Sequence, residues 1–217
     1  IYLTPSNQYP LGIATSLARR RALLQIASRE GAWIIEDDYD SELRYSGRPL
    51  ASLQGMDAAN RVVYVGTFSK SLSPDLRLGY IVAPSWAVGA LVAAKELADG
   101  HSNPEAQCTL ALLIRGGHLA RHVRRMRRIY ERRRGLILAA LDAELAPWLE
   151  PVPSVAGLHV AARVRAPLGE EQIVALARRA GVGVSALSRY GMRAAASRGI
   201  ALGYGNIGEA AIASGLA

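Results

Sequence analysis

Short apolar runs alternate with segments of helical periodicity along the first hundred residues, and this alternation limits the fold more than any other feature. The apolar runs at 32–40, 61–70 and 78–84 have the length of buried strands. A segment with apolar residues at helical spacing, 15–31, precedes the first run and ends at a glycine. Helices placed between short buried strands are typical of an α/β layer with a mainly parallel sheet.

The second half of the chain follows a different pattern. Helical spacing continues from Pro84 to about residue 147, and a proline-rich break follows at 147–157. The remaining segments read as strand, helix, strand and strand, which favours a smaller α+β domain. We therefore predict three parts. They are an α/β domain over 1–98, interdomain helices over 99–147 and a small C-terminal domain over 148–217.

Polar clusters stand at the ends of two predicted strands. The run "AWIIEDDYD" ends in acids, and "RVVYVGTFSK" ends in a loop that carries Lys70. In open α/β sheets ligands collect at the carboxyl ends of the strands. The sequence therefore predicts a binding site that both clusters share.

Lys70 is unusual because this chain has 24 arginines and only two lysines. Arginine stays protonated in proteins, so it cannot form a Schiff base, whereas a lysine amine can. Thr67, Ser69 and Ser71 add hydroxyl donors, and Arg77 adds a planar fork that suits a phosphate. An aldehyde-bearing phosphate cofactor needs both an amine and such an anion site. Lys95, within a predicted helix, is expected to be an ordinary surface lysine.

Pyridoxal 5'-phosphate is such a cofactor, and it also needs a carboxylate beside its ring nitrogen to act as an electron sink. Asp37 or Asp38 is placed to supply that carboxylate, and Tyr39 to bond the ring hydroxyl. Taken alone, "DDYD" is more often a solvated loop.

Nine arginines between residues 115 and 134 contribute to a net charge of +8. Such a run can bind phosphates, which would make the chain a nucleic-acid module. No aromatic stacking platform accompanies it, and an apolar stripe at helical spacing favours a long helix with a solvated basic face.

Several classes of protein are disfavoured. No apolar run approaches the roughly 20 residues that span a bilayer, and no signal peptide is recognisable. The single cysteine, Cys108, cannot form an internal disulfide, and with few histidines it predicts no metal site. We expect a cytoplasmic protein without a membrane partner. The chain opens at Ile1 directly in a predicted strand, which suggests an N-terminally truncated fragment.

Four stretches together resemble the aminotransferase-like domain of MocR/GabR-type bacterial transcriptional regulators, which belong to the fold-type I superfamily of pyridoxal-phosphate proteins. They are "TPSNQYPLG", "IIEDDYDSELRYSGRPLASLQGMD", "RVVYVGTFSKSLSPDLRLGYIVAP" and "SRYGM" followed by "IALGYGNI". The resemblance covers nearly the whole chain in order and spacing. It implies that 1–98 is the C-terminal part of a large cofactor-binding domain with a mainly parallel sheet.

The resemblance implies a role for each matching position. Lys70 forms the Schiff base and is the catalytic residue, and Asp37 holds the ring nitrogen. Tyr39 binds the ring hydroxyl, and Arg77 binds the phosphate with help from Thr67 and Ser69.

Other positions depart from the family pattern or have two candidates. The family motif is closer to "TPSHQYPTG", and here Asn7 and Leu11 stand at the two variable places. Tyr9 takes the place of an asparagine that commonly contacts the ring hydroxyl. Arg189 is the candidate for the carboxylate of an amino compound, and Arg198 is the alternative.

Two functions remain open beside the nucleic-acid module. The first is an effector domain that binds the cofactor on Lys70 and senses an amino acid or amine. The second is a genuine class I/II aminotransferase that transfers an amino group between an amino acid and a 2-oxo acid. The resemblance implies a homodimer, and it places DNA binding in an upstream winged-helix domain.

Overall fold

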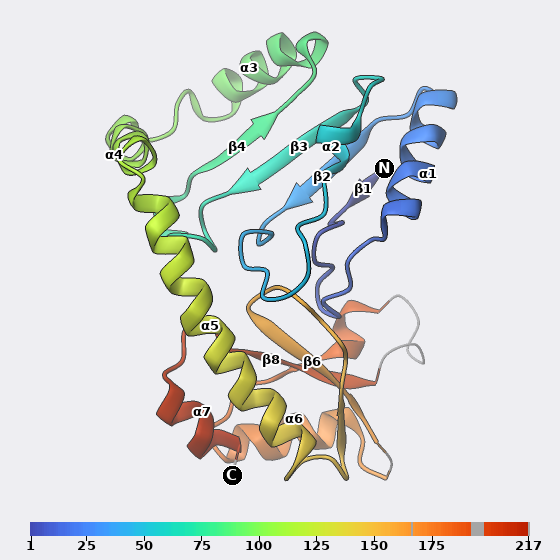
Figure 1. Ribbon diagram of the computed structural model, residues 1–217, viewed down its shortest axis with the longest axis vertical. Coiled ribbons are helices and arrows are strands. Elements are labelled where there is room, and N and C mark those ends of the chain that lie inside the picture. Colours follow the sequence, from blue (N-terminus) through green and yellow to red (C-terminus); the bar gives the residue numbers. More distant parts are fainter. Residues whose placement is uncertain (166, 192–197, 217) are drawn as a thin grey trace. The chain divides into compact units, whose positions relative to one another are not determined.

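The structure, a computed structural model, describes residues 1–165, 167–191 and 198–216 and divides into two compact units (Figure 1). Unit 1 comprises Ile1–Asn7, Ala14–Glu42 and Arg48–Arg125, and unit 2 comprises Gln8–Ile13, Leu43–Gly47 and Met126–Ala217. The division falls inside one long helix, α5 (His118–Asp142). The sequence analysis placed its divisions at residues 98 and 147 instead.

Unit 1 is built on a four-stranded sheet in the order β1-β2-β3-β4. Its strands are β1 (Tyr2–Leu3), β2 (Ile34–Asp38), β3 (Val62–Thr67) and β4 (Gly79–Val82). The first three strands run parallel, and β4 pairs with β3 in the antiparallel sense. The sheet is therefore mainly parallel.

The helix α1 (Leu17–Arg29) packs on one face of this sheet. It begins after Ser16, whose side chain accepts a hydrogen bond from the Arg19 amide, and it ends before Gly31, which has a φ of +64°. The core of this layer is a cluster of apolar residues from α1, β2, α2 (Leu53–Met56) and β3, namely Ala27, Ile34, Leu53 and Val62. Successive side chains of a strand point to opposite faces, so alternate residues of β2 are buried.

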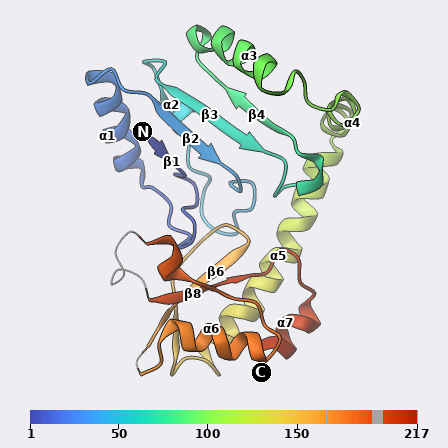
Figure 2. The same ribbon diagram turned by 180° about the vertical axis from the view of Figure 1, so that it is seen from behind.

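The remaining elements of unit 1 are a short helical turn between β3 and β4 and the helices that follow β4, which Figures 1 and 2 show from both sides. They are η1 (Pro74–Leu76), α3 (Ser85–Asp99), α4 (Pro104–Arg115) and the first part of α5. The order of elements agrees with the predicted alternation of helices and short strands.

Unit 2 contains an antiparallel four-stranded sheet in the order β5-β6-β8-β7. Its strands are β5 (Leu149–Pro151), β6 (His159–Val164), β7 (Ser185–Ala186) and β8 (Gly199–Gly203). Its helices are the second part of α5, α6 (Glu170–Arg179), η2 (Leu187–Tyr190) and α7 (Glu209–Leu216). Ile137 and Leu141 of α5 join Val160, Ile200 and Tyr204 in its apolar core. Among the described helices, none combines the length and the apolar character of a membrane-spanning segment.

Candidate functional site

The acid cluster and the lysine loop lie at the same edge of the unit 1 sheet. In the parallel pair of β2 and β3, Asp37 stands opposite Val65 and Asp38 opposite Gly66. Both strands therefore end together, and the segments that follow them leave the sheet side by side. This edge is where α/β sheets bind ligands.

Asp37 and Asp38 point to opposite faces of the sheet. Asp38 is buried, and its two oxygens accept hydrogen bonds from the Ser41 amide at 3.2 Å and the Tyr64 hydroxyl at 2.9 Å. Burial first, and then the charge of Asp38, raise the pKa of Tyr64 above its ordinary value. Both oxygens of Asp38 are therefore used in hydrogen bonds that stabilise the fold, whereas Asp37 is only partly buried on the other face.

Tyr2 is the side chain that holds Asp37. The register places Tyr2 opposite Ile35, so its ring lies on the same face as Asp37, and its hydroxyl donates to Oδ2 of Asp37. This hydrogen bond is the main reason that the pKa of Tyr2 is raised, with burial and the Asp37 charge adding to it. Oδ1 of Asp37 has no hydrogen-bond partner among the described residues. The sequence analysis missed Tyr2. Only the register of β1 against β2 shows that Tyr2 lies beside Asp37.

The loop after β3 presents the lysine and two hydroxyls. The Thr67 and Ser69 hydroxyl oxygens lie 3.0 Å apart, and the Ser69 amide donates to Oγ1 of Thr67 at 3.1 Å. The chain then turns tightly, because the amides of Leu72 and Ser73 both donate to the Phe68 carbonyl. Lys70 lies in this turn with an exposed side chain.

A close approach of β3 and β4 supports the start of the loop. A Cβ atom at Gly66 would lie 2.3 Å from the Tyr80 ring, so only glycine fits beside that ring. Tyr80 in turn packs on Phe68, with ring centroids 5.4 Å apart. Gly66 and Tyr80 therefore help to hold the loop that carries Lys70.

Arg77 follows η1 and has a φ of 51°, in the left-handed region. Its side chain is exposed. In the described part of the chain, neither Arg77 nor Lys70 forms an ion pair with a carboxylate, whereas Lys95 pairs with Asp99 on α3. Unit 1 therefore offers two uncompensated cations and two hydroxyls near one sheet edge, a set of groups that suits an anionic ligand.

Tyr39 leads to a buried polar pair that the sequence analysis did not assign. Its hydroxyl donates to the main-chain carbonyl of Asn7 at 2.6 Å, and the Asn7 amide group donates to Oδ2 of Asp40 at 2.6 Å. Asn7 was noted only as a departure from the family motif. No sequence signal would have paired two residues that are 33 positions apart.

Three candidate residues belong to unit 2 and are described within it. The Tyr9 hydroxyl donates to the Tyr190 hydroxyl at 3.2 Å, and its ring lies 4.8 Å from that of His159. Burial and the bond to Tyr190 raise the pKa of Tyr9 to about 12, and the charge of Arg189 opposes them. Arg189 lies in η2, and Arg198 is exposed directly before β8.

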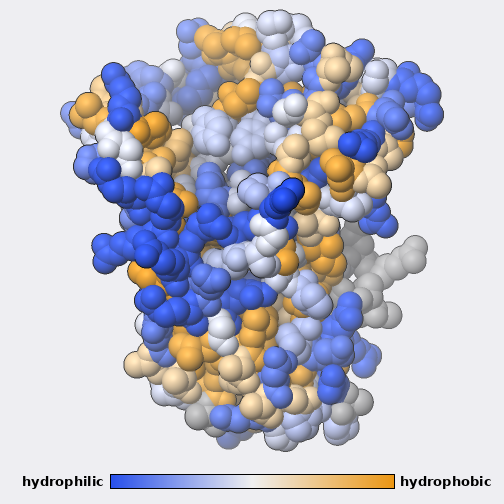
Figure 3. All heavy atoms as spheres, in the orientation of Figure 1, coloured by the Kyte–Doolittle hydropathy of each residue, from blue (hydrophilic) through white to orange (hydrophobic). Residues whose placement is uncertain are grey.

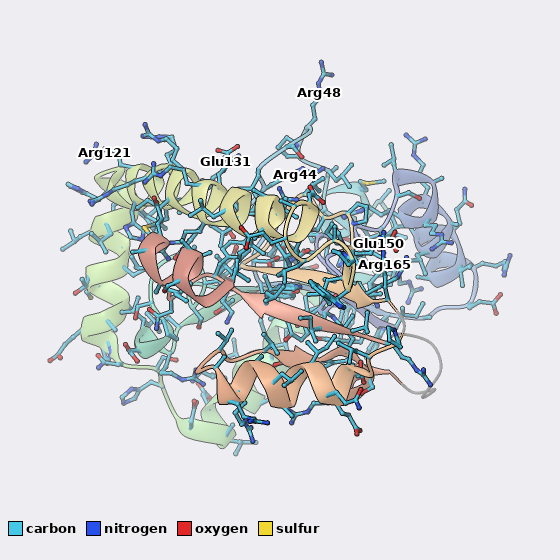
Figure 4. All side chains as sticks on the ribbon, turned by 90° about the horizontal axis from the view of Figure 1, so that it is seen from below. Arg44, Arg48, Arg121, Glu131, Glu150 and Arg165 are labelled. Carbon is cyan, nitrogen blue, oxygen red and sulfur yellow. The ribbon has the colours of Figure 1, made fainter. Side chains whose placement is uncertain are left out.

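Much of the arginine run on α5 serves the fold of unit 2. Arg133 donates to the carbonyls of Tyr204 and Gly205, and Arg132 pairs with Glu209 at 3.0 Å. Figure 4 shows Arg44 beside α5, where its carbonyl accepts a hydrogen bond from the Arg127 guanidinium at 2.5 Å. Arg134 donates in the same way to the carbonyl of Ser154. Hydrophilic side chains gather along α5 in Figure 3. The exposed arginines of this helix include Arg121, Arg124, Arg125 and Arg128. These contacts favour the interpretation of a structural helix with a solvated basic face.

Regulators resemble the chain over its whole length. It is 39% identical over 216 residues to the probable rhizopine catabolism regulatory protein MocR of Rhizobium meliloti, covering all of this chain and 44% of that protein. It is 36% identical to the uncharacterized HTH-type transcriptional regulator YdeL of Bacillus subtilis, covering 47% of it. The chain thus spans about half the length of the curated relatives that it matches. The resemblance to MocR-type regulators is confirmed.

Solved aminotransferases share the fold. The α-aminoadipate aminotransferase LysN of Thermus thermophilus, complexed with N-(5'-phosphopyridoxyl)-L-leucine, matches 99% of this chain with a TM-score of 0.89 and 30% identity, over 56% of its own length. The kynurenine aminotransferase of Pyrococcus horikoshii matches 99% of this chain with a TM-score of 0.90 and 27% identity, over 53% of its length. The predicted fold class is confirmed. Residues 3–199 match the family described as aminotransferase class I and II, and the chain therefore belongs to that family.

Proposed function

We propose that this chain is the effector-binding part of a MocR/GabR-type transcriptional regulator, which holds pyridoxal 5'-phosphate on Lys70 and senses an amino compound. The observation that carries the proposal is the match to such regulators over the full length of the chain. The family match and the pyridoxal compound in the related LysN structure indicate the cofactor. DNA binding would reside in another domain of a homodimeric protein.

The residues of unit 1 fit this cofactor. Arg77 and the hydroxyls of Thr67 and Ser69 supply a cation and donors for the phosphate, and no carboxylate among the described residues competes for Arg77. Lys70 supplies an exposed amine for the aldehyde. When bound, the cofactor supplies an electron sink.

Each side chain would then act at a stated atom. Asp37 would keep the ring nitrogen protonated through its open oxygen while Tyr2 holds the other oxygen. The Tyr39 hydroxyl would orient the ring hydroxyl from its place on Asn7. For Tyr9, Arg189 and Arg198, which belong to unit 2, the proposed roles stay those that the resemblance implies.

A genuine aminotransferase is the second candidate, because the solved structures with the same fold are aminotransferases. An aromatic-amino-acid aminotransferase of Thermococcus litoralis is also 36% identical over 155 residues. The same lysine would then move a proton at the substrate carbon. Both functions need the same residues in unit 1.

DNA binding by the intact protein distinguishes the two functions. For a regulator, we expect an amino compound to change the affinity for DNA upstream of its own gene, as measured by fluorescence anisotropy with a panel of amino acids and amines. Lys70→Ala should bind the DNA but lose this response. Steady conversion of an amino acid and a 2-oxo acid over many turnovers, with no DNA binding, would instead favour the aminotransferase.

The two aspartates should differ in their effect on the cofactor. Asp37→Asn should retain the cofactor but lower the pKa of its ring nitrogen by about 1–3 units, because an adjacent opposite charge shifts a pKa by that much. Asp38→Asn should leave the spectrum nearly unchanged and lower stability by about 1 kcal/mol, because its oxygens bind Ser41 and Tyr64. A pH titration of the bound cofactor's absorbance measures the two spectral effects, and urea unfolding measures the stability. Equal spectral shifts would contradict the assignment of Asp37.

A further inference from the structure

Asn7 and Asp40 form a polar pair that is almost completely buried. Asn7 follows β1 and Asp40 follows β2, and they are 1% and 3% exposed. Nδ2 of Asn7 donates to Oδ2 of Asp40 at 2.6 Å. A carboxyl group buried this deeply is costly in its charged form unless its oxygens are well bonded.

Each partner also has a side-chain oxygen that lacks a donor. Oδ1 of Asn7 and Oδ1 of Asp40 are both buried, and neither has a hydrogen-bond partner among the described residues. An ionised carboxylate and an amide oxygen are both acceptors, so they cannot satisfy each other. One proton taken from solvent onto Asp40 changes this, because a carboxylic acid and an amide can then exchange two hydrogen bonds.

The groups around Asp40 support a bound proton. Burial is the largest influence and raises the pKa of Asp40 to about 7. The charges of Asp38 and Glu42 raise this pKa further, whereas the hydrogen bond from Asn7 and the charge of Lys70 lower it. Asp40 therefore changes its protonation near neutral pH, far above the ordinary range of about 4.

Asn7 connects this pair to Tyr39. Its main-chain carbonyl accepts the Tyr39 hydroxyl at 2.6 Å, while its side chain bonds Asp40. Removal of the proton would set two acceptor oxygens against each other and would weaken the hold on Asn7. The position of Tyr39 would then depend on the charge of Asp40.

We propose that Asn7 and Asp40 form an acid–amide pair that holds one proton, and that this pair is the positioning device for the Tyr39 hydroxyl. The pair makes Tyr39 sensitive to pH. The consequence for the cofactor rests on the proposed function, in which Tyr39 binds the ring hydroxyl, and it predicts looser binding as the pH rises through about 7.

The sign of the stability effect follows from proton binding. In the unfolded chain an aspartate has a pKa of about 3.9, so between about pH 4 and pH 7 only the folded state keeps this proton. The contribution of Asp40 to stability therefore falls as pH rises through this window and is constant above it. Asp40→Asn should remove this pH dependence, because an asparagine also exchanges two hydrogen bonds with Asn7.

Infrared spectra of the intact protein without cofactor test the proton, between about pH 5 and pH 9. We expect a buried protonated-carboxyl band that titrates near pH 7 in the wild type. The band should be absent in Asp40→Asn and kept in the matched control Asp142→Asn, which removes an exposed carboxyl on α5. A wild-type spectrum that matches Asp40→Asn would overturn the proposal.

The same samples test the link to Tyr39. With ¹³C-labelled tyrosine, the Tyr39 ring signal, assigned by its loss in Tyr39→Phe, should shift with the midpoint of the carboxyl band. It should not shift in Asp40→Asn.

If the wild-type Tyr39 signal does not shift with this titration, the pair does not position Tyr39. Should Asp40→Asn fail to fold, ¹³C-labelled aspartate in the wild type still decides, because no proton is held if every aspartate carboxyl stays ionised across this pH range. None of these measurements needs the cofactor, so a failure of the proposed function is a separate result.

Discussion

Replacing Lys70 with alanine is expected to abolish the borohydride-reducible adduct between the intact protein and pyridoxal phosphate. Only an amine adds to the aldehyde, and the guanidinium of arginine stays protonated. Lys70→Arg should therefore lose the adduct as completely as Lys70→Ala, although it keeps the positive charge. Lys70 is exposed and has no ion pair among the described residues, so neither change should cost much stability.

The measurement is the mass of the peptide that contains Lys70 after incubation with the cofactor and reduction. Lys95→Arg is the matched control, because Lys95 is the second lysine of the chain and pairs with Asp99 on α3. It should keep the full adduct on Lys70. An adduct that persists in Lys70→Arg, or one that appears on Lys95 in the wild type, would show that the lysine is wrongly assigned.

Replacing Arg20 with methionine is expected to lower the free energy of unfolding of unit 1 by about 3–5 kcal/mol. Arg20 of α1 is fully buried. Its guanidinium donates to the carbonyls of Pro5, Thr15 and Ala51, and it lies 3.7 Å from Glu36. The change would therefore leave three carbonyls without their donor and Glu36 without its counter-charge.

Glu36 shows why the loss should be large. Burial raises the pKa of Glu36, although Arg20 and the amides of Leu53 and Gln54 oppose this. The Glu36 carboxylate accepts hydrogen bonds from both amides at 2.9 Å. It is therefore held in place and cannot move to reach solvent when Arg20 is removed. An uncompensated buried charge is among the most destabilising changes known in proteins.

Urea unfolding measures this loss through the fluorescence of Trp33 and Trp86, whose rings pack together in unit 1. The control is Arg21→Met, because Arg21 is the exposed neighbour of Arg20 on the same helix. It should change stability by no more than about 0.5 kcal/mol. Equal midpoints for the two variants would mean that the Arg20 contacts contribute little.

The chemistry that we predict for the site rests largely on single residues. A lysine in a chain that otherwise uses arginine indicates a need for an amine, and this inference requires no neighbours in space. The clusters around Asp37 and Lys70 were predicted at strand ends, and the parallel pairing of β2 with β3 places them at one edge. The roles of individual residues beyond this stay predictions.

Residues that depend on register were not readable. Tyr2 meets Asp37 because β1 and β2 pair with Tyr2 opposite Ile35. From the residues alone, the sequence analysis left open whether Asp37 or Asp38 supplies the carboxylate, and only the resemblance singled out Asp37. It did not identify Tyr64, on β3, as the partner that holds Asp38. A shift of one residue in either pairing would send these side chains to the other face.

The sequence by itself determined the order of helices and strands, because hydrophobic periodicity and turn residues act within a few neighbouring positions. Only the tertiary structure decided which polar residues are buried together. Arg20 with Glu36 and Asn7 with Asp40 join residues that are far apart in the chain. Likewise, arginines of α5 donate hydrogen bonds to main-chain carbonyls that only the fold of unit 2 brings close to them. The physical reason is that a buried polar group is stable only when distant segments of the chain supply its hydrogen-bond partners. No local sequence pattern shows which segments will come together.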